Sequence, residues 1–208
     1  MRFRLPGVRP PKPLLPQEIE HRLTGRQRQL LDELEELVVA EGLVDVTMAQ
    51  IAARVNCSLR TLYEISPSKD ELVLTVTDRR LHRIGREAIE SIDPELPPLA
   101  SLRSYLANAN RAVQSEKGEM ARSFSSLPGA RRIFDAHENY LTEIVQRLLD
   151  LAVEGGDISS MDTAAVAHVL AGLGQQFSHP DVLPMISKSA KQTADDLTEI
   201  ILRGLEHG

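Results

Sequence analysis

The chain has 208 residues, of which 42% are hydrophobic and only 3% aromatic, and it carries a formal net charge of −6. Its single cysteine, Cys57, excludes an internal disulfide and any paired-cysteine metal site. No stretch approaches the roughly 18 consecutive apolar residues of a transmembrane helix, and the charged N-terminus lacks the pattern of a signal peptide. We therefore expect a cytoplasmic chain with no membrane partner, and its abundant Leu, Ala, Glu and Arg favour an all-α fold.

The charge is unevenly distributed along the chain. Residues 91–208 hold 16 acidic and 10 basic side chains, which account for the whole net charge, whereas residues 1–28 hold seven Arg or Lys against two Glu. Residues 1–16 contain five prolines, which exclude a helix there. We expect residues 1–22 to form a disordered or extended basic arm, which is either a solvated tail or a contact to nucleic acid.

From Thr24 onward the apolar residues follow helical spacing. A first helix is predicted from Thr24 to Gly42, because its leucines recur on one face and glycine is a frequent helix stop. A second helix begins at Thr47, whose hydroxyl can cap it while Gln50, three residues later, completes a capping box. Its apolar face ends at Val55, so this helix is only about two turns long.

The next residues predict a tight turn between two short helices. Asn56 tolerates the left-handed conformation that ends a helix, and Ser58 can cap a further helix that reaches Glu64. Ala52 is the small residue expected where the two helices cross, and Leu62 is the apolar plug of the second helix. Such an arrangement is a helix-turn-helix.

Cys57 falls within this turn. A small apolar side chain suits a position beside the helix interface, and a free cysteine behaves there as a small hydrophobe. The alternative is a redox-sensing thiol, which requires exposure and a lowered pKa. Arg60 is close enough in sequence to keep that alternative open, because a nearby cation lowers the pKa of a thiol.

Five further helices are predicted from the spacing of apolar residues and from Pro and Gly breaks between them. Their approximate bounds are 68–89, 99–113, 130–154, 162–178 and 189–206. No strand-like alternation persists, so the sequence predicts an all-α protein.

Sequence motifs for catalysis are absent. There is no Gly-x-Ser-x-Gly and no phosphate-binding loop, and the six histidines show no zinc-ligand spacing. A di-iron helical bundle needs two Glu-x-x-His motifs on facing helices, and only Glu18 to His21 fits that pattern. We therefore expect no catalytic residue, no metal site and no cofactor, and hence no enzyme.

Four stretches in order along residues 26–76 carry a family resemblance. They are LLDELEELVVAEG ending at Gly42, Thr47 followed by Ile51-Ala52, Ser58-x-x-Thr61-Leu62-Tyr63, and Ser68-Lys69-Asp70-Glu71-Leu72. Together they resemble the DNA-binding domain of the TetR (tetracycline repressor-like) family of transcriptional regulators. The chain departs from the family pattern at Asn56, which is usually Gly, at Cys57, which is often Val, and at Ile65, which is usually aromatic.

The resemblance implies three parts in an all-α chain. After the arm at residues 1–22, residues 23–70 would form a three-helix helix-turn-helix DNA-binding domain, and residues 71–208 a C-terminal helical bundle for ligand binding and dimerisation. It implies a sequence-specific transcriptional regulator, more often a repressor, that binds double-stranded operator DNA. Residues 91–208 match no motif of their own and only suit the family's variable C-terminal domain.

The resemblance also implies which residues contact DNA, with the helix at 58–64 in the major groove. Phosphate contacts are expected from Thr47, Tyr63 and Lys69. Base contacts are expected from Ser58, Leu59, Arg60 and Thr61. Arg60 is the best candidate, because a guanidinium pairs bidentately with guanine O6 and N7. The alternative for Arg60 is a solvated surface charge, and for Tyr63 a half-buried core aromatic.

Dimerisation is expected from the last two predicted helices. Ala and Gly residues on helix 162–178 permit close approach of another helix, and helix 189–206 has an apolar stripe. Each surface could instead be intramolecular core, but the resemblance favours a homodimer, whose two-fold symmetry implies a palindromic operator.

A small-molecule effector of unknown identity is expected to bind between the C-terminal helices. The candidate contacts are the larger or polar-tipped side chains Tyr105, Met120, Phe124, Phe134, His137, Tyr140 and Phe177. For each of them ordinary core packing is the alternative. For the whole protein, the alternative is a DNA-binding helical regulator with no effector.

Overall fold

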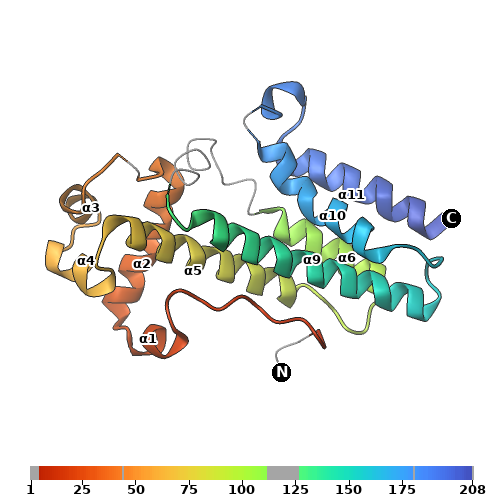
Figure 1. The fold of residues 1–208 in the computed structure, drawn as a ribbon, viewed down its shortest axis with the longest axis horizontal. Helices are drawn as coiled ribbons and strands as arrows, with labels where there is room; N and C mark the ends of the chain where they lie inside the picture. Colours follow the sequence, from red (N-terminus) through yellow and green to blue (C-terminus); the bar gives the residue numbers. More distant parts are fainter. Residues whose placement is uncertain (1–4, 44, 112–126, 180, 208) are drawn as a thin grey trace. The chain divides into compact units, whose positions relative to one another are not determined.

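The structure is a computed structural model that describes residues 5–43, 45–111, 127–179 and 181–207. Within these ranges all regular secondary structure is helical, which confirms the expected all-α fold (Figure 1). None of the helices described there combines the length and the apolar character needed to cross a bilayer.

The chain divides into two compact units, which are described separately. The N-terminal unit comprises Lys12–His82 and Glu116–Phe134, and the C-terminal unit comprises Met1–Pro11, Arg83–Ser115 and Asp135–Gly208. The helices whose residues lie wholly or partly in the N-terminal unit are α1 (Gln17–Arg22), α2 (Gly25–Glu41), α3 (Met48–Arg54), α4 (Leu59–Ile65), α5 (Lys69–Glu90) and α9 (Ala130–Gly155). Both α5 and α9 supply residues to both units.

Helices α2 and α3 begin at the predicted positions, and each follows a threonine N-cap, of which Thr47 was predicted as a cap. Thr24 and Thr47 each accept a hydrogen bond from the backbone N–H three residues later, while Gln27 and Gln50 each accept one from the N-cap N–H. Both capping boxes are therefore complete. Helix α2 ends at Gly42, whose φ of 74° is the left-handed conformation that glycine adopts at little cost.

The turn between α3 and α4 has the predicted geometry. Asn56 adopts a left-handed φ of 47°, and the N–H of Cys57 donates to the carbonyl of Ala52 at 3.0 Å. The hydroxyl of Ser58 accepts from the N–H of Thr61 and so starts α4. Helices α3 and α4 pack together, with Leu62 fully buried. The helix-turn-helix predicted from the sequence is present.

Leucines and other aliphatic residues from α2 to α5 form one core in the N-terminal unit. Its most deeply buried members are Leu30, Leu31, Leu34, Ile51, Leu62, Leu72, Val73 and Val76. Helices as short as α3 and α4 are marginal in isolation, so burial against this core is what stabilises them.

The N-terminal segment is packed against the rest of the chain. Residues 5–16 form no helix, as the prolines predict, but Leu5 is buried in the C-terminal unit's core and Leu15 packs against the N-terminal unit's core. For residues 5–16, the structure therefore agrees with the extended alternative. The following residues form α1, a six-residue helix that the sequence analysis did not predict.

Helix α1 is attached to the N-terminal unit by a cluster of charges around Arg79 of α5. The Arg79 guanidinium donates to Glu20 of α1 at 3.2 Å, to Asp32 of α2 at 2.9 Å, and to Glu35 of α2. Burial alone would lower the pKa of Arg79, but the hydrogen bonds and charges of Asp32 and Glu35 outweigh it and raise that pKa. Only 14% of the Arg79 side chain is exposed, and Glu35 is buried.

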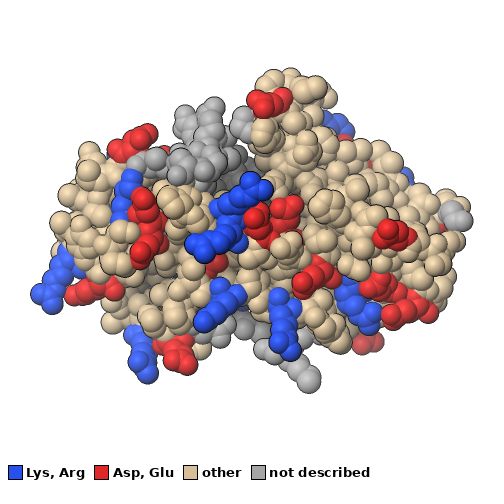
Figure 2. Space-filling view, viewed as in Figure 1, with Lys and Arg blue, Asp and Glu red and all other residues tan. Residues whose placement is uncertain are grey.

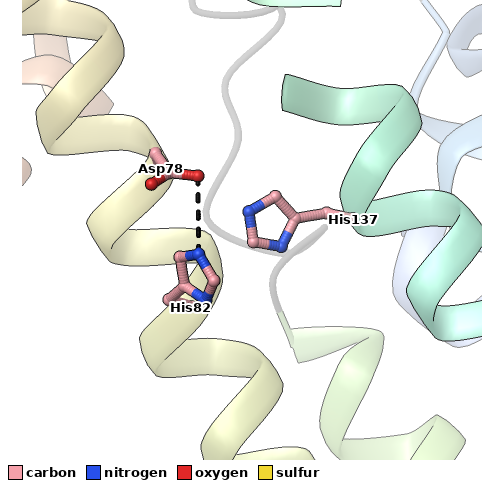
Figure 3. Close-up of side chains that lie close together, drawn as sticks. All are labelled: Asp78, His82 and His137. Atoms are coloured by element: carbon pink, nitrogen blue, oxygen red, sulfur yellow. Dashed lines mark ion pairs between the residues drawn. The ribbon is translucent and has the colours of Figure 1, made fainter. Parts of the chain in front are cut away.

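The neighbouring carboxylate of α5, Asp78, has a similar role. It is buried and accepts a hydrogen bond from the backbone N–H of Leu14 at 2.7 Å. One turn further along α5, His82 lies with Nε2 3.7 Å from the Asp78 carboxylate (Figure 3). Asp78 and Arg79 therefore attach both the extended segment and α1 to the same helix.

The C-terminal unit contains parts of α5 and α9 together with α6 (Pro98–Ala109), α10 (Thr163–Ser178), the 3-10 turn η1 (Leu183–Met185) and α11 (Ala190–His207). Helix α6 ends at Ala109, and the predicted end at residue 113 lies outside the described residues. The most deeply buried core residues are Leu102, Tyr105, Leu106, Ile144, Val145, Leu149, Ala152, Ala167 and Leu202.

Helix α11 packs against both α10 and α6 and is also fixed by charge. Arg103 of α6 forms a bidentate pair with Glu206, with both distances 2.8 Å, and its Nε donates to Glu199 at 3.0 Å. Hydrogen bonds from Arg203 and Arg103 lower the pKa of Glu199, and the one from Arg103 lowers the pKa of Glu206. The start of α11 has a third capping box, in which Ser189 and Gln192 exchange hydrogen bonds.

Replacement of Arg79 by Ala is expected to lower the free energy of unfolding by about 3 kcal/mol, because it leaves the Glu35 carboxylate buried without its cation. Urea denaturation followed by circular dichroism measures this change. Arg26→Ala is the control, since Arg26 forms an exposed pair with Glu33 in the same unit and should cost less than about 1 kcal/mol. Equal losses in the two variants would contradict a structural role for the Arg79 cluster.

Candidate nucleic-acid interface

Helix α4 presents four large side chains to solvent, one of which is the acidic Glu64. Arg60 is the most exposed, with 88% of its side chain accessible, and Leu59 and Tyr63 are also exposed. Leu62, between them in sequence, is the buried plug that holds α4 on the unit. The seven-residue helix α4 therefore has one buried residue that anchors it. Its exposed face carries apolar, cationic, aromatic and acidic groups.

The hydroxyls at the start of α4 are already hydrogen-bonded. Ser58 Oγ accepts from the N–H of Thr61 at 3.0 Å and lies 2.7 Å from Thr61 Oγ1. Both side chains were predicted to read bases, but in this structure their hydroxyls stabilise the helix start. Leu59, Arg60 and Tyr63 are exposed side chains of α4 that make no such cap hydrogen bond.

Thr47 is in a comparable situation at the start of α3. Its hydroxyl donates to Gln50 Oε1 at 3.1 Å and accepts from the N–H of Gln50 at 3.3 Å. Thr47 is exposed, as a phosphate contact requires, yet its hydroxyl proton is used by the capping box. Gln50, which the sequence analysis treated only as part of the cap, is exposed beside it.

Lys69, the third predicted phosphate contact, opens α5. Its side chain is 25% exposed, and Nζ lies 3.9 Å from the Asp70 carboxylate, at the limit of an ion pair. The hydroxyl of Ser68 accepts from the N–H of Glu71 at 3.2 Å and so caps the start of this helix. Lys69 thus stands at the first turn of a long helix.

Charges of both signs are mixed on this part of the molecule. Figure 2 shows basic and acidic side chains interspersed over the visible face, including a basic and an acidic group next to each other over α4. On α4 itself, Arg60 Nε donates to Glu64 Oε1 at 3.0 Å. Glu64 was not among the residues assigned to DNA from the sequence, although its spacing of four residues from Arg60 could have indicated the pair.

Cys57 has the properties of a structural cysteine. It is half-buried in the turn, packs against the core of the N-terminal unit, and its Sγ lies 3.5 Å from the carbonyl of Ser58. Burial raises the pKa of the Cys57 thiol, and Arg26 offsets this only in part. The nearby cation that acts on the thiol is therefore Arg26, and a raised pKa argues against the redox-sensor alternative.

The predicted effector contacts are assigned to both units. Tyr105 and Tyr140 belong to the core of the C-terminal unit, where burial raises the pKa of both phenols. His137 and Phe177 are half-buried in the same unit, whereas Phe134 packs against the core of the N-terminal unit. Met120 and Phe124 lie outside the described residues.

Helices α10 and α11 each have an exposed side. Val169 of α10 is 53% exposed and Ile200 of α11 is 64% exposed. Ala164 and Ala165 are exposed as well, while Ala167 and Gly174 are buried within the unit. Only part of the small-residue surface predicted on α10 therefore faces outward. The apolar stripe predicted on α11 lies partly against the core and partly toward solvent.

No protein-family model matches this sequence, and no curated protein matches it at the sequence level. Solved structures with the same fold are numerous, and three are representative. A TetR-like transcriptional regulator from Rhodococcus sp. RHA1 is 25% identical with a TM-score of 0.60, covering 90% of this chain and 100% of that chain. A transcriptional regulator from Cytophaga hutchinsonii ATCC 33406 is 17% identical with a TM-score of 0.69, covering 88% and 98%. AibR, in complex with isovaleryl coenzyme A and operator DNA, is 17% identical with a TM-score of 0.61, covering 84% and 97%.

The raised pKa of Cys57 predicts a slow thiol. At a pH of about 8, its reaction with Ellman's reagent should be slower than that of N-acetylcysteine, because less thiolate is present. The same protein unfolded in urea supplies the control and should react at the ordinary rate. A folded-state reaction faster than that of the free thiol would restore the redox-sensor hypothesis.

Proposed function

We propose that this chain, which has the fold of the TetR-type transcriptional regulators, binds operator DNA sequence-specifically and regulates transcription as a homodimer. The single observation that carries the proposal is the helix-turn-helix, in which α4 is anchored by Leu62 and presents Leu59, Arg60 and Tyr63 to solvent. This surface combines the groups that contact bases and phosphates in the major groove.

Each side chain of α4 suits a particular part of the duplex. The guanidinium of Arg60 reads guanine through O6 and N7, and the exposed Leu59 can contact the methyl group of thymine. The hydroxyl of Tyr63, together with Lys69 and Thr47, supplies phosphate contacts that fix the position of α4 without reading sequence. Ser58 and Thr61 contribute by forming the start of α4. They also contact bases if their hydroxyls exchange these hydrogen bonds for bonds to bases when DNA binds.

Dimerisation of the C-terminal unit would place two copies of α4 on the two halves of a palindromic operator. The exposed Val169 and Ile200 lie on α10 and α11, which pack against each other within the unit. An isologous contact between two such helix pairs buries these side chains and lets the exposed alanines of α10 approach a partner helix closely.

A small-molecule effector is the second part of the proposal. AibR holds isovaleryl coenzyme A and operator DNA in one structure, so this fold can accommodate both kinds of ligand. In this chain Tyr105, His137, Tyr140 and Phe177 are the described candidates within the C-terminal unit. An effector would favour a dimer geometry in which the two recognition helices no longer match the operator. A DNA-binding helical regulator with no effector is the alternative.

Binding to DNA is tested by fluorescence anisotropy with a duplex from immediately upstream of the protein's own gene and a scrambled duplex, across a range of salt. We expect preference for the native duplex, and Arg60→Ala should lower the discrimination by about 1–3 kcal/mol. Arg147→Ala, which removes an exposed Arg–Glu pair of the C-terminal unit, is the control and should leave it unchanged. Equal binding of both duplexes would remove the support for a local operator, and unchanged discrimination in Arg60→Ala would exclude base reading by Arg60.

The dimer surface is tested by sedimentation equilibrium. A charge at Ile200 would be buried without a partner in the proposed interface, so Ile200→Arg should shift the protein at micromolar concentration from dimer to monomer. Leu96→Arg is the matched control, because Leu96 is 47% exposed in the loop before α6 and outside the proposed interface. A wild-type monomer, or a dimer that tolerates Ile200→Arg, would contradict the proposed surface.

A further inference from the structure

We infer that Glu64 is a positioning residue for Arg60 and that it increases the specificity of DNA binding at the expense of affinity. The inference rests on the proposed function, because it assigns a role within the same α4 surface. It concerns the one acidic side chain of α4, in the sequence LRTLYEI, which lies where a negatively charged duplex would approach.

The geometry of the pair leaves the reading end of Arg60 available. Glu64 Oε1 accepts from Arg60 Nε at 3.0 Å, across one turn of α4. Nε is the donor nearest the aliphatic stem, so both terminal Nη groups remain for another partner. Those two groups are the ones that can pair end-on with guanine O6 and N7. The carboxylate therefore orients the guanidinium without occupying the atoms that read a base.

Orientation matters because, within the part of the chain that the structure describes, little else restrains the Arg60 side chain. It is 88% exposed, and the hydrogen bond to Glu64 is the contact that holds it on α4. A long side chain that is ordered only on binding loses conformational entropy at that moment, which weakens the specific complex. Glu64 supplies part of this ordering before DNA arrives.

The charge of Glu64 has a second effect, which does not depend on sequence. Its side chain is 53% exposed, so the carboxylate repels phosphates of any duplex that α4 approaches. A correct guanine offsets this cost through the pre-oriented Arg60, whereas an incorrect sequence does not. Unfavourable interaction with the wrong partner is a general source of specificity.

The N-terminal unit contains a matched pair for comparison. Arg54 of α3 donates to Glu41 of α2, and both side chains are exposed, but neither lies on α4. Replacing Glu41 by Gln changes the net charge by the same amount as replacing Glu64 by Gln. Exposed pairs contribute little to stability, so both variants should fold. A difference between them in DNA binding therefore reflects the position of the carboxylate.

The experiment begins with an operator selected from random duplexes by the wild-type protein. The affinities for this operator and for a scrambled duplex are then measured by anisotropy for wild type, Glu64→Gln, Glu41→Gln, Arg60→Ala and the double variant Arg60→Ala/Glu64→Gln. Glu64→Gln should lower the ratio of the two affinities about tenfold, mainly by raising the affinity for the scrambled duplex. Glu41→Gln should leave the ratio unchanged.

The double variant separates positioning from direct contact. If Glu64 acts through Arg60, the Gln substitution should leave the affinity ratio unchanged once Arg60 is Ala. An undiminished effect in the Arg60→Ala background would overturn the inference and assign Glu64 its own base contact. Equal ratios for Glu64→Gln and wild type would also overturn it. Failure of the wild-type protein to select any operator would instead overturn the proposed function.

Discussion

The N-terminal unit is held together around one largely buried guanidinium, that of Arg79. Arg79 holds α1 and α2 to α5 through Glu20, Asp32 and Glu35, and the helix-turn-helix packs on α2 and α5 through the shared leucine core. A cation paired with three acidic groups is stable in a largely buried position only when its hydrogen bonds are satisfied. The adjacent Asp78 extends the same anchoring to the backbone of Leu14.

Supported by this core and charge cluster, the seven-residue helices α3 and α4 can form the surface that is proposed to contact DNA. Neither α3 nor α4 is long enough to be stable by itself, so each relies on an N-cap and on a buried plug. The same hydroxyls that give α3 and α4 their starting points are those that the family pattern assigns to DNA. Under the proposed function, base readout would therefore rest mainly on Arg60 and its neighbours on α4, whose side chains make no cap hydrogen bond.

Local signals in the sequence predicted much of this fold. The capping box at Thr47, the left-handed Asn56 and the stop at Gly42 depend on residues within a few positions of one another, and the structure has all three. Helix α1 and the Arg79 cluster were missed because their partners are 44 to 59 residues apart in sequence. The core that Phe134 packs against was also not predicted, because helix spacing alone cannot indicate which of two cores an aromatic residue joins. Similarly, the sequence suggested Arg60 as the neighbour of Cys57, but the folded chain brings Arg26 there instead.

The capping boxes of α2, α3 and α11 are all closed by the same type of residue, and this affects how they respond to pH. In α2, α3 and α11 the residue that closes the box is glutamine, at positions 27, 50 and 192, where glutamate would serve equally well as an acceptor. An amide has no proton to gain or lose over the range in which carboxylates titrate. The hydrogen bonds that close these three boxes therefore do not depend on the protonation of a carboxylate, whereas α10 begins at the carboxylate of Asp162, which accepts from the N–H of Ala165.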